Sequence, residues 1–447
     1  MTTVLFIVLA LVGLPLFIVL GAAALTATRE AQLDPALLMV EFARLASSPN
    51  LVAIPLFVLA GATLGQGGAP KRLVRFFNSL LGWMPAGIAW VAVLTCMVFT
   101  AFSGASGVTI LALGGLLYPM LKHEHYSDKF ALGLITSGGS MGLLLPPSLA
   151  VLLYGVVAQV DIGDLFVAGL LPTVLLFVMV GAYALLRGAR GAPRHRFRLR
   201  ELTLAARASW ADLLLPVGVI GGLAGGYLTV AELAACTALY ALLLETVIHR
   251  EISLKQLVWV VHEAAVLVGS LFIILGLSLG LTNLLIDAQV PMHLLDWVQA
   301  KVTSPLEFLI WMNLALLAVG CMMDIFSAIV IVTPLLLPLA THFGIHPVHL
   351  GIVILANLEI GYLTPPVGIN LFLASQRFKK PVFAVFRATL PFLFVLLVWL
   401  LLLTYLPGLS LWSLDAAVDT SGLGGQALGA VCQADGATSS YGVKVST

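Results

Sequence analysis

Long apolar runs, separated by short polar stretches, recur along almost the whole chain. Several exceed 18 residues and carry few charges, which is enough for an α-helix to cross a bilayer. Shorter segments at 34–46, 70–82 and 291–301 carry polar residues on one face and suit the membrane–water interface. The pattern predicts an all-α polytopic membrane protein. Its continuous spans are expected at about 3–26, 51–67, 163–187, 210–228, 230–249, 258–287 and 384–406.

Two stretches of the chain share one pattern. Residues 105–155 align without a gap with residues 324–374, at an offset of 219 positions. In each copy an apolar helix and a polar hinge are followed by a second apolar helix that Gly and a double proline interrupt. The sequence therefore predicts two re-entrant hairpins and two broken spans. The hairpins are expected at about 85–122 and 305–343, and the broken spans at about 128–157 and 347–376.

The double prolines, Pro146-Pro147 and Pro365-Pro366, interrupt the two spans at matching positions. Proline has no backbone N–H, so carbonyl groups that precede it lose their helical partners. Lipid cannot satisfy those groups, and such breaks persist where the backbone lines a polar cavity. Paired breaks in corresponding halves indicate the binding site of a secondary transporter. A purely structural kink is the alternative for either break taken alone.

Composition agrees with a membrane protein. Of 447 residues, 60% are hydrophobic and 10% charged, with a mean hydropathy of +1.08. Soluble domains carry about 25% charged residues. The net charge of +1 gives no reason to expect a nucleic-acid partner. With Met1 in the cytoplasm, the basic residues fall on the cytoplasmic side in all but four of 22 cases, the exceptions being Arg29, Arg44, Lys301 and Lys444.

This distribution of basic residues predicts a cytoplasmic N-terminus and a periplasmic C-terminus. The first hairpin then opens from the cytoplasm and the second from the opposite face, so the copies are inverted repeats of an elevator-type ion transporter-like fold. Residues 1–414 would form the transporter, and the Gly-, Ala- and Ser-rich tail at 415–447 would be disordered. Within the transporter we expect a first repeat at about 1–187, an Arg-rich cytoplasmic loop at about 187–207 and a second repeat at about 210–406.

Oxygen atoms gather at the hinge and break of the first copy. The candidate sodium ligands there, partly through backbone carbonyls, are Ser103, Ser106, Gly142, Leu145 and Pro147. The half-helix that starts at Ser148 directs its positive N-terminal dipole toward the same cavity. Ser106 and Ser148 are therefore candidate contacts for an anionic substrate. The alternative is close helix packing, because Gly and Ser are common where membrane helices touch.

The second copy adds two acidic residues. Its candidate sodium ligands are Gly320, Asp324, Gly361, Thr364 and Pro366, and its candidate substrate contacts are Glu359 and Asn370. A charge inside the membrane is costly and usually faces a cavity or a partner. Asp324 and Glu359 could therefore be ion ligands, proton carriers or structural caps.

Other polar residues give weaker signals. Asp212, Glu232 and Glu245 lie near span ends and are interpreted as interfacial or capping groups. The hairpin bases carry histidines that the topology places in surface loops on opposite faces, which argues against one metal site: His123, His125, His342, His346 and His349. The chain contains no GxxxxGK[ST] phosphate loop and no nucleophile-elbow motif, so we predict that it is not an enzyme.

Several motifs resemble the large membrane (M) subunit of tripartite ATP-independent periplasmic (TRAP) transporters, DctM-like, over about residues 1–413. They are Ala53–Phe57 with Ala60-Gly61, Ser103–Ser106, Gly142–Ser148, Leu214–Pro216, Thr229–Glu232, Met323-Asp324 and, most specifically, Pro347–Phe372. The chain departs from the family at Thr229–Glu232, where Thr-Pro-Thr-Glu is frequent, and at Ala105, where serine is frequent.

The resemblance implies a sodium-coupled elevator in the bacterial inner membrane. It also implies a periplasmic substrate-binding protein that delivers an organic acid, and a separate small four-helix membrane subunit. We hypothesise a permease subunit that imports a carboxylate-type organic acid, uses sodium ions and no organic cofactor, and contacts membrane lipids. The alternatives are a sodium-coupled anion carrier that works without a binding protein, and a non-transporting membrane scaffold, which would not need paired broken helices.

Overall fold

The structure is a computed structural model that describes residues 16–30, 32, 34–46, 49–188, 197–224, 227–299, 301–302 and 304–412. Within these ranges every regular element is a helix. The helices are α2 (Leu16–Glu30), α3 (Ala36–Ala46), α4 (Pro49–Gln66), α5 (Ala69–Leu81), α6 (Gly87–Ser103), α7 (Ser106–His123), α8 (Asp128–Gly138), α9 (Leu149–Ala158), α10 (Ile162–Gly188), α11 (Leu199–Ala224), α12 (Val230–Leu243), the π-helix η1 (Leu244–Ile248), α13 (Leu254–Asp287), α14 (Val290–Gln299), α15 (Pro305–Met322), α16 (Ile325–His342), α17 (Pro347–Gly361), α18 (Ile369–Phe378) and α19 (Val382–Tyr405).

The chain is a multi-pass helical membrane protein. In the described part of the chain, seven helices are long and apolar enough to cross a membrane. They are Ile162–Arg187, Leu199–Gly222, Val230–Ile248, Leu254–Leu285, Pro305–Met322, Ile325–His342 and Val382–Tyr405. A further pair, Leu51–Gln66 with Ala69–Leu81, passes the same test together and bends by 74° at its break. Length and composition alone thus admit both helices of the expected second hairpin as full spans.

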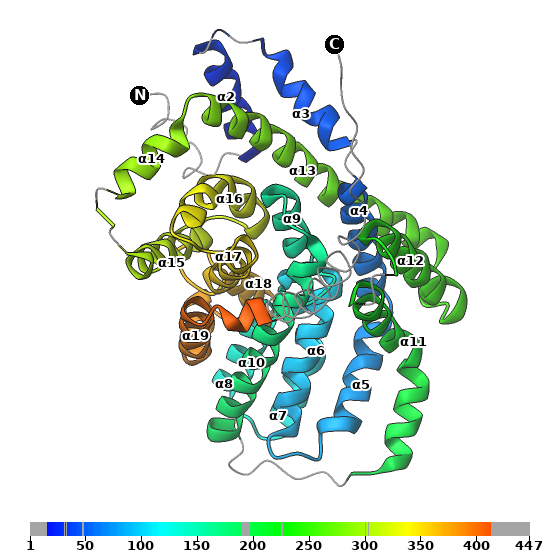
Figure 1. Ribbon diagram of the computed structural model, residues 1–447. Coiled ribbons are helices and arrows are strands. Elements are labelled where there is room, and N and C mark those ends of the chain that lie inside the picture. The colour runs from blue at the N-terminus through cyan, green and yellow to red at the C-terminus, as the bar shows by residue number, and fades with distance from the viewer. Residues whose placement is uncertain are drawn as a thin grey trace, which may run out of the picture.

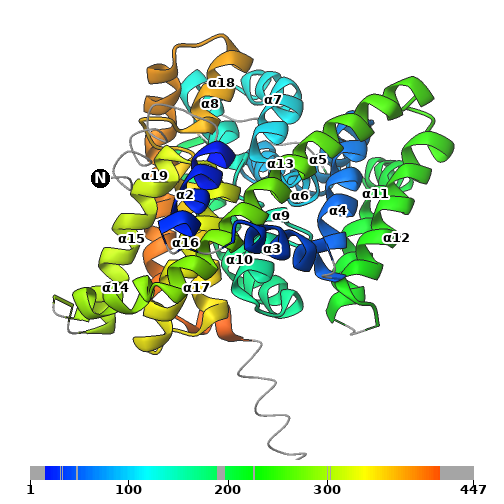
Figure 2. The ribbon, with the colours of Figure 1, turned by 90° about the horizontal axis from the view of Figure 1, so that it is seen from above.

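The helices form three groups that lie side by side in both views (Figures 1 and 2). Helices α4, α11 and α12 lie on one side and α15 and α19 on the other, with α6, α9 and α10 between them. The long helix α13 packs against α2, α3, α4 and α16, and so connects the outer groups. Apolar side chains from most helices join one continuous core, in which Trp399, Tyr154 and Phe166 are fully buried.

In both stretches, helices lie where the hairpins and the broken spans were predicted. Helices α6 and α7 form the first hairpin, and α15 and α16 form the second. The offset of 219 positions carries the bounds of α7 onto those of α16, and the start of α8 onto the start of α17. After each break a ten-residue helix follows, α9 in the first copy and α18 in the second. The sequence pattern was therefore correct about the order and the length of these elements.

One expected element bound needs correction, and three expected segments lie partly or wholly outside the described residues. The span expected at 210–228 begins at Leu199, inside the expected loop at 187–207. Hydropathy marks where a helix becomes apolar, but the polar turns before that point also form helix, with Arg198 paired to Glu201 at 3.0 Å. The beginning of the span expected at 3–26, the middle of that loop and the tail at 415–447 lie outside the described residues.

Candidate functional site

The tip of the first hairpin is a single tight turn. Gly104 has φ of +65°, a left-handed conformation that glycine adopts without steric cost, and it ends α6. Ala105 is extended and precedes α7 without a side-chain cap. Gly104 lies against Leu149, the first residue of α9. The hairpin tip and the start of the second half of the first broken helix are therefore adjacent.

Buried hydroxyl groups join this hairpin to the first break. The Thr100 hydroxyl donates to the Gly139 carbonyl at 2.8 Å and lies 2.8 Å from the Thr109 hydroxyl. Because the only proton of the Thr100 hydroxyl goes to Gly139, Thr109 is the donor of the second bond. Ser103 lies at the edge of this group, 3.4 Å from the Thr109 hydroxyl. Sequence reasoning selected Ser103 and missed Thr100 and Thr109, which look like ordinary apolar-helix threonines.

The first break runs as a series of turns from Gly139 to Ser148, and its Pro146-Pro147 peptide bond is cis. Gly142 lies directly against the backbone carbonyl of Met97 in α6. Ser148 precedes α9, and its buried hydroxyl has no hydrogen-bond partner among the described residues. An unpaired buried hydroxyl is costly. It is therefore available to a ligand.

The second hairpin and break are joined mainly through backbone atoms. Gly320 and Gly361 lie backbone against backbone, and the Val367 N–H donates to the Cys321 carbonyl at 3.1 Å. The Tyr362 hydroxyl accepts a hydrogen bond from the Ile325 N–H at 2.7 Å. The Pro365-Pro366 peptide bond is cis, as in the first copy. Tyr362 directly follows the break glycine, a position that sequence reasoning passed over.

Two predicted ligands of the second copy already have local partners. The Asp324 carboxylate caps α16 by accepting from the Ser327 N–H at 2.9 Å, which confirms the capping interpretation. The Thr364 hydroxyl donates to the Gly361 carbonyl at 2.9 Å. Both side chains keep unused oxygen lone pairs. Together with free carbonyls, such hard oxygens are the ligands that hard cations prefer.

Side-chain hydrogen bonds connect the two copies: the Tyr154 hydroxyl in α9 donates to the Pro347 carbonyl at 2.7 Å, and a second bond lies near the hairpin tip. The Ser106 hydroxyl, in the first turn of α7, donates to the Asn370 side-chain carbonyl in α18 at 2.7 Å. Both side chains are buried, and the Asn370 amino group has no partner among the described residues. Both residues sit in the first turns of their helices, where the helix dipole favours negative charge. Ser106 and Asn370, which the sequence placed in separate copies, therefore belong to one site.

Glu359 lies apart from this pair. It is fully buried in α17, and neither carboxylate oxygen has a hydrogen-bond partner among the described residues. No described hydrogen bond joins it to Ser106, Ser148 or Asn370. Its neighbour along the helix, Asn357, donates to the Asn313 side chain at 2.7 Å. The expected substrate contact of Glu359 thus stays a prediction.

The histidines do not form a metal site. No group of three or more His, Cys, Asp or Glu side chains in the described ranges is arranged to hold a metal ion. His349 is buried, with Nδ1 2.7 Å from the Ser410 hydroxyl and Nε2 3.3 Å from the Thr404 carbonyl. The surface-loop interpretation of His349 was wrong, because its spacing along an apolar helix gave no sign of these distant partners.

The acidic residues near span ends have two different roles, helix capping and ion pairing. Glu232 and Thr229 form a reciprocal capping box at the start of α12, as expected. Asp212 and Glu245 instead hold Arg72 of α5, at 2.6 Å each, in a largely buried cluster. Sequence analysis missed this pairing, because a basic partner about 140 or more positions away cannot be recognised from local sequence.

A multi-pass helical protein in which proline interrupts a helix at corresponding positions of two segments is typical of secondary transporters. The chain belongs to the family of the tripartite ATP-independent periplasmic transporter, DctM component, whose model matches residues 3–409. It is a large permease subunit of this transporter class and not an enzyme.

Individual proteins that are similar to this chain belong to the same transporter family. The chain is 36% identical to the C4-dicarboxylate TRAP transporter large permease protein DctM of Pseudomonas aeruginosa, over 81% of this chain and 85% of that protein. It is 34% identical to the isethionate TRAP transporter permease protein DctMQ of Oleidesulfovibrio alaskensis, over 91% of this chain but only 65% of that protein. It is 31% identical to the ectoine TRAP transporter large permease protein TeaC of Halomonas elongata, over 82% of this chain and 87% of that protein.

A solved structure shares the fold. The crystal structure of the Alcanivorax borkumensis YdaH transporter superposes with a TM-score of 0.58 at 16% identity, over 91% of this chain and 98% of that one. At this identity the likeness concerns the arrangement of helices alone.

Proposed function

We propose that this chain is the permease subunit of a sodium-coupled transporter that imports an organic acid across the bacterial inner membrane. The observation that carries the proposal is the Ser106–Asn370 hydrogen bond, which joins the first hairpin to the second broken helix. Unpartnered donors lie at this pair and at the start of α9, namely the Asn370 amino group and the Ser148 hydroxyl. A carboxylate could accept from such donors near helix N-termini. The names of the relatives, which include a C4-dicarboxylate permease, favour a small organic acid.

Sodium coupling is supported by the oxygen chemistry of the two breaks. The first offers the Thr100, Ser103 and Thr109 hydroxyls beside the turns that begin at Gly139. The second offers the Asp324 carboxylate, the Thr364 hydroxyl and the backbone carbonyls of the break. We assign one cation site to each break, with the residues predicted from the sequence as ligands, partly through backbone carbonyls. The described part of the chain holds no side-chain cluster suited to a transition metal.

The proposed mechanism is an elevator built from inverted repeats. The two hairpins and broken helices would move as one unit against a frame that includes α11 and α12. A small four-helix membrane subunit on a separate chain would brace the frame, and a periplasmic binding protein would deliver the substrate. The distribution of basic residues supports a cytoplasmic N-terminus.

Uptake by proteoliposomes tests this function. The permease would be reconstituted with the small subunit and the binding protein, and C4-dicarboxylates would be the first substrates tried. Uptake should require an inward sodium gradient and should stop when potassium replaces sodium. Undiminished uptake in potassium would show that transport is not coupled to sodium. Uptake that persists without the binding protein would favour the simpler anion carrier. Absence of uptake for a broad set of acids, with all partners present, would favour a scaffold.

A further inference from the structure

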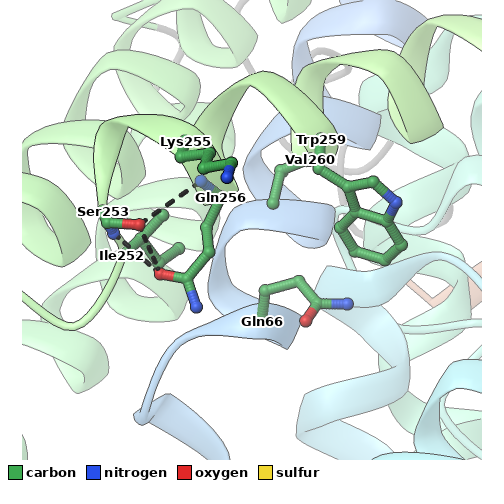
Figure 3. Close-up of a pocket in the computed structure, with 7 residues that line it drawn as sticks. All are labelled: Gln66, Ile252, Ser253, Lys255, Gln256, Trp259 and Val260. Atoms are coloured by element: carbon green, nitrogen blue, oxygen red, sulfur yellow. Dashed lines mark hydrogen bonds between the residues drawn. The ribbon is translucent and has the colours of Figure 1, made fainter.

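A half-enclosed pocket lies where α4 ends and α13 begins (Figure 3). Its volume of about 470 Å³ falls in the range of about 300–1,000 Å³ that small-ligand sites occupy. None of its lining residues belongs to the hairpins or the broken helices, so it is distinct from the proposed transport site. The lining residues are Gln66, Ile252, Ser253, Lys255, Gln256, Trp259 and Val260.

The side-chain amide of Gln256 presents its donor end to this pocket. The Ser253 N–H donates to Gln256 Oε1 at 2.9 Å, and the Ser253 hydroxyl lies 2.9 Å from the same oxygen. A backbone N–H can only donate, so the amide oxygen must face Ser253. The amino group of Gln256 therefore points away from Ser253, toward the side of the pocket where Gln66 lies (Figure 3).

The charge of the pocket is positive. Lys255 is the only ionisable side chain that lines it, and no ion pair of Lys255 is found among the described residues. The nearby acid Glu251 is already held by Arg72 at 2.6 Å and by the Gly68 N–H at 2.5 Å. Burial acts to raise the pKa of Glu251, but the hydrogen bond and charge of Arg72 outweigh it, so this pKa lies below its ordinary value. A carboxylate that is charged and already paired leaves Lys255 free for an anion.

The ends of two apolar helices indicate that the pocket lies near the boundary between membrane and water. The apolar span of α13 begins at Leu254, and α4 ends at Gln66 on the opposite wall. Next to the pocket, Leu254 and Val258 are 80% and 71% exposed on α13. The Trp259 ring forms one wall, and tryptophan is enriched at membrane–water interfaces. A ligand that fits must combine an anionic head with apolar tails.

We propose that this pocket binds the phosphate headgroup of an anionic phospholipid. Lys255 pairs with the phosphate, the Gln66 and Gln256 amides donate to its oxygens or to the glycerol, and the acyl chains follow Leu254 and Val258. Basic pockets between membrane helices are known to hold such headgroups.

Native mass spectrometry of the delipidated full-length chain tests the proposal with phosphatidylglycerol as the probe. Lys255→Ala should weaken binding of one phosphatidylglycerol molecule about fivefold, the usual effect of one basic residue near a membrane surface. Lys255→Arg keeps the charge and should bind like the parent. Lys71→Ala is the matched control, because Lys71 is an exposed lysine in the first turn of α5 that does not line the pocket. Equal binding by the Lys255→Ala and Lys71→Ala variants would overturn the proposal.

Two further arms separate a lipid from other occupants. Inorganic phosphate is titrated alone; if it protects Lys255 from an amine-reactive reagent and phosphatidylglycerol does not, the site takes a free anion and the lipid proposal fails. The same protection assay is repeated with the small subunit bound. Protection by that subunit, with no loss of phosphatidylglycerol from Lys255→Ala, would show a protein interface and would also overturn the proposal. Protection by phosphatidylglycerol alone supports it.

Discussion

The two helix breaks share a sequence pattern but lie in different surroundings. In the first, the double proline and the residue after it, 146–148, are buried; in the second, the matching residues 365–367 are exposed. The polar contacts differ as well. Side-chain hydroxyls join the first break to its hairpin, whereas backbone atoms, one aromatic hydroxyl and two apposed glycines join the second.

Close backbone packing explains why the first break is covered. Gly61 in α4, Gly142 in the break and Gly169 in α10 each lie directly against a backbone carbonyl of α6 or of the break itself. Small residues allow membrane helices to approach this closely. A transporter with alternating access needs states in which its two sides differ, and a covered first break with an exposed second break is an asymmetry of that kind.

Chemical labelling should give the largest contrast between the breaks. Val367 is 42% exposed and Ser148 is fully buried, although the offset of 219 positions matches them. With the four native cysteines replaced by alanine, Val367→Cys should react with a maleimide in the purified protein while Ser148→Cys stays largely unreacted. Equal labelling would mean that the two breaks are equally accessible in solution.

The next largest effect should come from the break glycines. A Cβ at Gly142 would overlap the Met97 carbonyl, and a Cβ at Gly361 would overlap the Gly320 backbone. Overpacking costs about 1–3 kcal/mol of stability, so either alanine variant should lower the unfolding temperature in detergent and reduce uptake. Gly218→Ala is the control, because nothing lies within 4 Å of a Cβ there. If all three variants transport normally, close backbone approach is not required at either break.

Local signals predicted the elements of this site well. Glycine, double proline and a hydroxyl-rich hinge interrupt apolar runs within a few residues, so the hairpins and breaks could be located from sequence. Ser106 was selected in the hydroxyl-rich hinge of the first copy, and Asn370 as a substrate contact after the break of the second copy. Their direct bond could not be predicted, because 264 positions separate them and nothing local encodes the distance.

Sequence analysis failed mainly to predict polar partners that lie far apart along the chain. Arg72 bonds to Asp212, Glu245 and Glu251, and His349 bonds to Ser410. Considered alone, Asp212 and Glu245 were interpreted as interfacial or capping groups, and His349 as a surface-loop residue. Pairing across the fold decides whether such a residue is buried, and one sequence carries no record of that pairing.

The hydroxyl network is specific to the first break and should have the third largest effect. The offset places Val319 and Ala328 where the first copy has Thr100 and Thr109. Thr100→Val leaves the Gly139 carbonyl and the Thr109 hydroxyl without this partner, at a cost of about 1–3 kcal/mol. The unfolding temperature in detergent and the rate of uptake should both fall. Thr95→Val is the control, because the Thr95 hydroxyl bonds only to Val91 within α6; an equal loss there would refute a special role for the network.

The Ser106–Asn370 hydrogen bond should have a smaller effect. Ser106→Ala and Asn370→Ala should each raise the substrate concentration for half-maximal uptake about three- to tenfold, because one hydrogen bond contributes about 0.5–1.5 kcal/mol. The double variant should be little worse than the worse single variant. Fully additive effects in this cycle would show that the two side chains act independently.

The smallest effect should come from Thr364→Val, which removes one oxygen at the exposed break and nearly preserves volume. The Thr364 hydroxyl donates to the Gly361 carbonyl, so only its lone pairs are left for a cation. One ligand among several contributes little, and the sodium concentration for half-maximal uptake should rise about threefold while the maximal rate is kept.

Thr389→Val is the matched control for this last change, because its hydroxyl donates to Val385 within α19, away from both breaks. Uptake would be measured across a sodium series for parent, Thr364→Val and Thr389→Val. A shift confined to Thr364→Val places a sodium ligand at the exposed break, where an ion from solution can reach it. If the Thr364→Val and parent sodium curves coincide while Ser106→Ala shifts its own, the hydroxyl ligands lie at the covered break alone, and the exposed break can coordinate sodium only through Asp324 and backbone carbonyls.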